Sequence, residues 1–71
     1  MELSARNQLA GRIVAITLGA VMAEVTIDLG NGQIVVAAIT RGSVEGMGLK
    51  EGDEVVAIIK ATEVLVGKRT R

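Results

Sequence analysis

The chain has 71 residues and can form one domain at most. A domain of this size buries only about 60% of the surface that its unfolded chain exposes, so it needs a further source of stability. The absence of cysteine and histidine excludes disulfides and a structural zinc site, which leaves oligomerisation as the expected source. Eight acidic and eight basic residues give zero net charge, which argues against a general binder of nucleic acid or acidic membranes.

The first half of the chain predicts three strands. Residues 12–18, which follow Gly11, are rich in β-branched side chains, as strands are. Residues 21–28 predict a second, half-buried strand, because Val25 and Ile27 alternate with polar neighbours. An Asn31-Gly32 pair predicts a tight hairpin turn into a third strand over 33–40. The continuous apolar run in this third strand predicts that both of its faces are covered.

The second half predicts a short helix and two more strands. Residues 40–47 predict one or two helical turns, with Thr40 or Ser43 as the N-cap and Gly48 as the stop. A turn over 49–53 leads into a fourth strand over 54–60, and residues 64–66 predict a short fifth strand. The expected fold is therefore all-β: a small OB-like five-stranded barrel with one short helix, assembling as an oligomer. Residues 67–71 are expected to form a flexible basic tail of this single domain, 1–71.

The apolar composition also favours contact with a partner chain. Phe, Tyr and Trp are absent, so the core lacks the large burial that aromatic rings supply. We expect some small aliphatic side chains to lie against a second chain, although a compact monomer stays an alternative. The N-terminal residues do not resemble a signal peptide, and the longest apolar run, 34–39, is too short to cross a bilayer. A cytoplasmic protein without a membrane partner is expected.

The sequence offers little chemistry for catalysis and more for binding an anion. No histidine or cysteine is present as a nucleophile or general base, so an enzyme is not expected, and no acidic cluster has the spacing of a calcium loop. Three segments instead carry hydrogen-bond donors suited to an oxyanion, although each also has a purely structural explanation. They are Ser4-Ala5-Arg6-Asn7, Thr40 to Ser43 at the start of the predicted helix, and Lys60 with the following Ala61.

The same three segments resemble the molbindin (Mop, or TOBE-domain) family of small molybdenum-pterin-binding proteins. The resemblance covers residues 4–66, in order. Its most specific motif is the opening Ser-Ala-Arg-Asn-Gln-Leu-Ala-Gly over residues 4–11. The others are Ala-Glu-Val at 23–25, an Ile-Thr-x-x-Ser-Val segment at 39–44, Met-Gly-Leu-Lys-Glu-Gly at 47–52 and Ile-Lys-Ala-Thr-Glu-Val at 59–64.

This resemblance implies a hexamer, built as a trimer of dimers with an N-terminal strand exchanged between partners, that stores molybdate or tungstate at its subunit interfaces. Metal would enter only as the oxyanion, and the resemblance leaves open whether a pterin is also carried. Arg6 and Lys60 would offset the charge of a dianion. Carried over by position, the ligating set would be Ser4, Ala5 and Arg6 of one chain with Thr40, Ser43, Lys60 and Ala61 of a neighbour, the two alanines giving backbone N–H groups.

Two other functions compete with oxyanion storage. The stretch over residues 49–55 is reminiscent of swapped-hairpin DNA-binding transcriptional regulators, although the neutral charge and the lack of a basic strand face argue against them. A ligand-free assembly subunit is the other alternative. A DNA-binding regulator would bind DNA with a steep dependence on salt concentration. A ligand-free subunit would have a melting temperature that does not change with molybdate.

Overall fold

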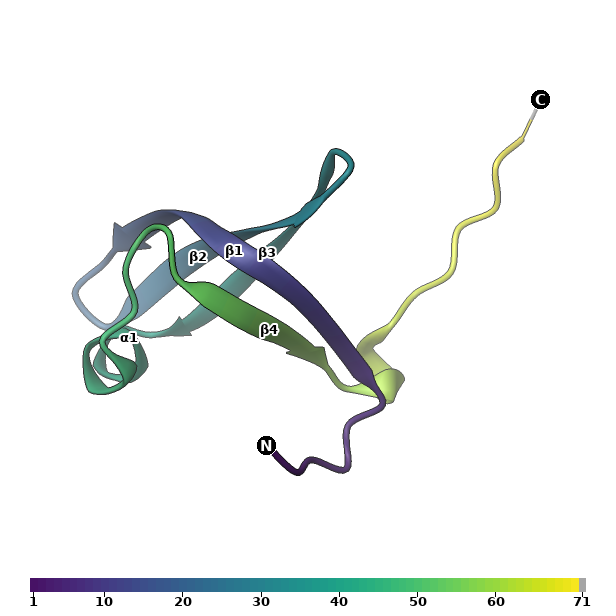
Figure 1. The fold of residues 1–71 in the computed structure, drawn as a ribbon. Coiled ribbons are helices and arrows are strands. Elements are labelled where there is room, and N and C mark those ends of the chain that lie inside the picture. Colours follow the sequence, from purple (N-terminus) through teal and green to yellow (C-terminus); the bar gives the residue numbers. More distant parts are fainter. Residues whose placement is uncertain (71) are drawn as a thin grey trace.

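The computed structural model describes residues 1–70, which form one antiparallel sheet of four strands, one short helix and a 3-10 turn (Figure 1). The strand order is β3-β2-β1-β4, and the sheet curls into a half-barrel. In chain order the elements are β1 (Asn7–Leu18), β2 (Met22–Gly30), β3 (Gln33–Thr40), α1 (Arg41–Met47), β4 (Glu54–Ile59) and the 3-10 turn η1 (Ala61–Glu63).

The curl of the sheet comes from the long central strand β1. Its first half pairs with β4 and its second half with β2, and Arg12 faces both Glu54 and Asp28 at the crossover. A register shift between Ile13 and Ala15 marks a β-bulge just after this point. Because a bulge bends a strand and increases its twist, β1 can belong to both halves of the curled sheet.

The core lies on the concave face of the sheet. Val25 and Ile27 are buried while their polar neighbours are not, which confirms the alternation predicted for the second strand. Val44 of α1 covers one end of this core. Apolar burial is the main source of stability for such a small domain. The six buried core residues are Ile13, Ala23, Val25, Ile27, Val44 and Ala57.

The predicted turn and helix signals are confirmed. Asn31 adopts a positive φ of 53° in the turn between β2 and β3, as a tight hairpin requires. Thr40 is the N-cap of α1, since its hydroxyl oxygen accepts a hydrogen bond from the backbone N–H of Ser43 at 3.0 Å. Gly48 ends the helix in the left-handed conformation.

Three expectations about the strands need correction. The predicted fifth strand is wrong, because residues 64–66 are extended but pair with no strand among residues 1–70. The first strand begins at Asn7 rather than at residue 12, because its first half pairs with β4. The third strand has only one covered face within the chain, since Ile34 and Val36 stay 58% and 56% exposed.

Two further observations concern the ends of the chain and the helix. Arg71, the last residue of the predicted basic tail, lies outside the described residues. Among residues 1–70, no helix has the length and apolar character that crossing a membrane would require.

Candidate functional site

The pairing of β1 with β4 brings two predicted site segments together. Asn7, the first residue of β1, faces Ile59, the last residue of β4, in a register that continues regularly from Arg12 and Glu54. Arg6 directly precedes β1 and Lys60 directly follows β4, so these two residues occupy the next position beyond the last pair. Ser4, Ala5, Arg6, Lys60 and Ala61 thus gather at one end of the sheet, which we call the cationic end.

Local hydrogen bonds hold the backbone of the cationic end. The side-chain amide of Asn7 donates to the carbonyl oxygen of Ile59 at 3.1 Å, and this ties the two strands at their last pair. The amide of Gln8 donates to the carbonyl oxygen of Ala5 at 2.8 Å, which turns the incoming chain. On the other strand, the carbonyl of Lys60 accepts from the backbone N–H of Glu63 at 2.9 Å and starts η1.

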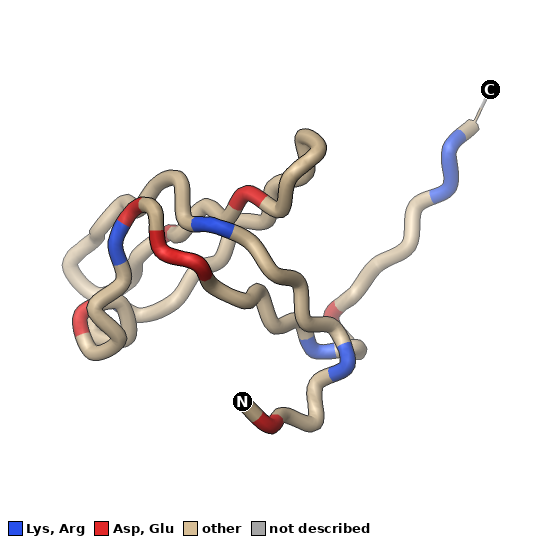
Figure 2. Tube along the Cα trace, viewed as in Figure 1, with Lys and Arg blue, Asp and Glu red and all other residues tan. Residues whose placement is uncertain are grey.

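The two cations at this end have no acidic partner within the described residues 1–70. The ion pairs found there involve Arg12, Arg41 and Lys50 and leave Arg6 and Lys60 out. Figure 2 shows basic segments meeting where β1 begins and β4 ends. Adjacent like charges repel each other, and a bound anion relieves that repulsion. The cationic end is therefore suited to an anion, and Arg6 also offers a planar fork of donors.

Thr40 and Ser43 lie at the opposite end of the sheet. Thr40 faces Met22 at the start of β2, next to the turn that follows the last residue of β1. The two hydroxyl oxygens are 2.7 Å apart and share a hydrogen bond. The Ser43 N–H donates to Thr40 and the Arg41 N–H donates to the carbonyl oxygen of Val21 at 2.8 Å. These two N–H groups at the helix start are thus already bonded and are not free to donate to an anion.

One chain therefore presents the predicted set as two separate groups. Five of its members are at the cationic end and two are at the start of α1. Ser4, Arg6, Thr40, Ser43, Lys60 and Ala61 are all exposed, and Ala5 is half-buried. An oxyanion enclosed by members of both groups needs a second copy of the chain.

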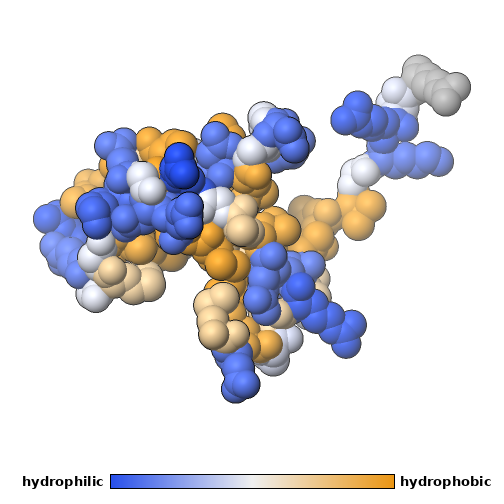
Figure 3. Space-filling model, viewed as in Figure 1, coloured by the Kyte–Doolittle hydropathy of each residue, from blue (hydrophilic) through white to orange (hydrophobic). Residues whose placement is uncertain are grey.

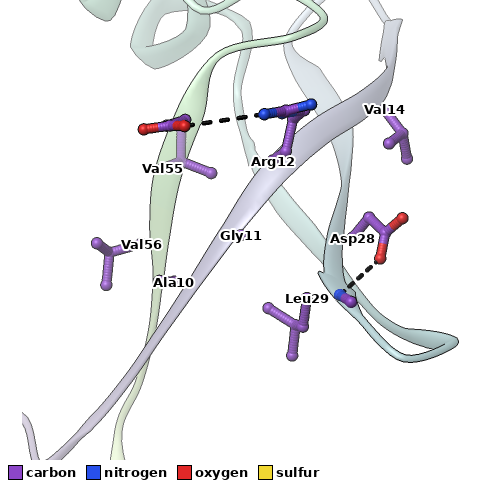
Figure 4. Close-up of a pocket in the computed structure, with 10 residues that line it drawn as sticks. Ala10, Gly11, Arg12, Val14, Asp28, Leu29, Val55 and Val56 are labelled. Carbon is purple, nitrogen blue, oxygen red and sulfur yellow. Dashed lines mark hydrogen bonds and ion pairs between the residues drawn. The ribbon is translucent and has the colours of Figure 1, made fainter.

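Two hollows flank the sheet, and only one reaches the cationic end. On the concave side, a groove of about 600 Å³ runs between β3 and β4 and is lined by aliphatic side chains, with Lys60 and Glu63 at one rim. On the other side, a shallow hollow of about 620 Å³ contains none of the predicted residues (Figure 4). There Arg12 points to Glu54 at 3.8 Å, and Asp28 accepts from the backbone N–H of Gly30 at 2.8 Å.

Asn7 has a role that the sequence does not reveal. Its amide was a candidate anion donor, but it bonds instead to a carbonyl 52 positions away in the sequence. Only the pairing of β1 with β4 identifies this partner. Asn7 therefore adds a side-chain bond between the two strand ends that carry Arg6 and Lys60.

Comparison with known proteins gives consistent matches over nearly the whole chain. The model of the TOBE domain matches residues 3–66. The chain is 46% identical over 66 residues to molybdenum-pterin-binding protein 3 of Clostridium pasteurianum, covering 93% of this chain and 97% of that protein. It is similar to the structure of a molybdate-binding protein from Sporomusa ovata, with a TM-score of 0.89, 44% identity and coverage of 96% of this chain and all of that one.

A larger relative shows the same domain. The cytoplasmic molybdate-binding protein ModG, in a crystal form with molybdate bound, superposes with a TM-score of 0.81 and 44% identity. The match covers 86% of this chain and 43% of that one.

Proposed function

Because the chain belongs to the TOBE-domain family of molybdenum-pterin-binding proteins, the molbindins, we propose that it binds molybdate or tungstate between the subunits of a homo-oligomer. The members of this family are binding proteins, so the chain is not an enzyme. We propose that reversible uptake of the oxyanion serves intracellular molybdenum storage in the cytoplasm.

The observation that carries the proposal is the position of Arg6 next to Lys60. Their formal charge of +2 matches the −2 of a tetrahedral oxyanion, and neither is engaged by a carboxylate within residues 1–70. A dianion loses much hydration free energy on binding, so it needs both opposite charge and several donors. Ser4 adds a hydroxyl, and Ala5 and Ala61 add backbone N–H groups.

A second chain supplies the remaining donors in this proposal. Thr40 and Ser43 lie at the far end of their own sheet, so their hydroxyls reach an anion at the cationic end only from a neighbouring subunit. The assembly proposed is a homohexamer, a trimer of dimers. A shell made only of donors favours fully deprotonated molybdate over protonated phosphate, and its size discriminates against the smaller sulfate. A pterin is not required by this arrangement.

The strands give no support to DNA binding. Arg12 is the single cation within the four strands of the described chain, and it faces Glu54 at 3.8 Å. A strand ribbon that enters a DNA groove needs several basic side chains for the phosphates. Oxyanion binding is therefore the function that the charges support best.

Isothermal titration calorimetry tests the proposed function directly. Molybdate, tungstate and sulfate are titrated into the protein at equal ionic strength, so that nonspecific screening is the same in all three. We expect saturable heats with molybdate and tungstate and little heat with sulfate. Equal weak heats for all three anions would refute selective oxyanion binding.

A further inference from the structure

The turn between β2 and β3 contains an Asn-Gly step at the tip of an exposed hairpin. Asn31 and Gly32 are both exposed, and their φ angles of 53° and 77° are those of a two-residue hairpin turn. Figure 1 shows this tip projecting beyond the rest of the sheet, and the hydropathy colouring in Figure 3 shows hydrophilic atoms there. Water therefore has free access to both residues.

Nothing in the described part of the chain ties down the Asn31 amide. Within residues 1–70, neither this amide nor the backbone N–H of Gly32 takes part in a hydrogen bond. A Cβ added at Gly30 or at Gly32 would meet no atom of the described chain within 4 Å. Glycines on both sides of Asn31 also give the backbone wide freedom to rearrange. The amide carbon of Asn31 and the nitrogen of Gly32 are thus free to approach each other.

The other asparagine of the chain lies in the opposite environment. Asn7 is half-buried at the start of β1 and faces Ile59 of β4. Its amide donates to the carbonyl oxygen of Ile59 at 3.1 Å. The next residue, Gln8, pairs with Ile58 and carries a side chain that hinders attack by its backbone nitrogen. The fold therefore protects Asn7 and leaves Asn31 unprotected.

We propose that Asn31-Gly32 is a site of spontaneous modification, at which Asn31 is converted to aspartate and isoaspartate. The Gly32 nitrogen attacks Cγ of Asn31, a C–N bond closes a five-membered succinimide ring, and the amide nitrogen leaves as ammonia with the proton of the Gly32 N–H. The two atoms are held close by the chain itself, which favours an intramolecular attack.

Water is the co-reactant that completes the reaction. It opens the ring at Cγ to give aspartate, or at the main-chain carbonyl carbon of residue 31 to give isoaspartate. Each product has gained a hydroxyl group in place of the NH2 group of asparagine, and no atom changes its oxidation state. Both products add one negative charge at the hairpin tip.

The two products differ in their effect on the hairpin. Aspartate suits the same turn, because Asp-Gly and Asn-Gly are both favoured in two-residue hairpins. Isoaspartate instead places Cβ of residue 31 in the main chain, so the turn gains one backbone atom. The turn sets the register of β2 against β3, which runs from the Gly30 and Gln33 pair to the Met22 and Thr40 pair. We therefore expect the isoaspartate form to melt at a lower temperature than the natural chain.

Incubation of the full-length protein in mildly alkaline buffer at physiological temperature tests the proposal. Peptide mass mapping measures conversion at each asparagine, and chromatography against synthetic peptides separates aspartate from isoaspartate. Asn7 is the internal control, and we expect at least tenfold more conversion at Asn31, with both products present. Asn31→Asp is the matched variant, because it keeps a favoured turn but has no amide to lose. Its release of ammonia should be at least tenfold lower than that of the natural chain.

Comparable conversion at Asn7 and Asn31 would overturn the proposal. Aspartate without isoaspartate would also overturn it, because direct hydrolysis by water gives aspartate alone. Equal release of ammonia from Asn31→Asp and from the natural chain would place the reaction at another amide. An unchanged melting temperature in the purified isoaspartate form would contradict its effect on the hairpin. None of these measurements involves an oxyanion, so their outcome is independent of the proposed function.

Discussion

Gly11 occupies a position of β1 where the fold leaves no room for a side chain. An added Cβ would lie 2.6 Å from Cγ2 of Ile27 and 2.7 Å from the carbonyl oxygen of Asp28. We expect Gly11→Ala to lower the free energy of unfolding by about 1–3 kcal/mol, as overpacking typically does, and thermal denaturation measures it. Gly46→Ala is the control, because nothing lies within 4 Å of its Cβ and alanine favours a helix, so its melting temperature should rise. Equal melting temperatures for the two variants would contradict the close approach at Gly11.

Arg6 and Lys60 are the residues on which oxyanion affinity should depend most. A hydrogen bond to a charged group contributes about 1.5–3 kcal/mol, so Arg6→Ala or Lys60→Ala should each weaken molybdate binding roughly ten- to a hundredfold. Calorimetry measures the change. Arg12→Gln is the matched control, since it removes a cation that already faces Glu54 at the hollow on the other side. Unchanged affinity in both alanine variants would place the site elsewhere.

At the scale of the element, α1 depends on the hydroxyl of Thr40. This hydroxyl accepts from the Ser43 N–H at the start of a helix of only seven residues. Loss of an N-cap costs about 1 kcal/mol, which lowers the melting temperature of a domain this size by roughly 4–8 °C. We therefore expect this decrease for Thr40→Ala, measured without any anion, and almost none for Thr40→Ser. A Thr40→Ser variant as unstable as Thr40→Ala would show that the methyl group matters rather than the cap.

Elements fixed by local signals could be predicted from the sequence. The Asn31 turn, the Thr40 cap and the Gly48 stop each depend on neighbours within a few positions, and all three are present. The early start of β1 was missed because β4, about 50 residues away in sequence, pairs with residues around Gln8 that have no strand pattern. Residues 64–66 have the composition of a strand, but strand formation needs a partner edge, and these residues pair with no strand within the described chain.

The candidate site also combines features that depend on nearby residues with features that depend on residues far away in the sequence. Donor types such as Arg6 and Thr40 can be chosen from sequence, because their chemistry is local. Their grouping cannot, because only the register of β1 against β4 sets Arg6 beside Lys60. The bonded state of the Ser43 N–H likewise depends on the rotamer of Thr40.

At the scale of the whole molecule, stability and ligand binding should be coupled. The core contains six buried residues, none of them aromatic, so contact between chains is expected to contribute much of the stability. We expect the melting temperature to rise with protein concentration and with molybdate. Free molybdate at 100 times its Kd adds about 2.7 kcal/mol to the free energy of unfolding. Sulfate at equal ionic strength is the control, and an equal rise with sulfate would indicate a general salt effect.

The position of bound molybdenum tests the central claim most directly, namely that the oxyanion is enclosed by two chains. A crystal grown with molybdate and measured at the molybdenum absorption edge locates the metal by its anomalous signal. We predict a peak between Arg6 and Lys60 at the cationic end of one chain, with Thr40 and Ser43 of a second chain completing the shell. A peak surrounded by residues of one chain alone, or one remote from Arg6 and Lys60, would contradict it.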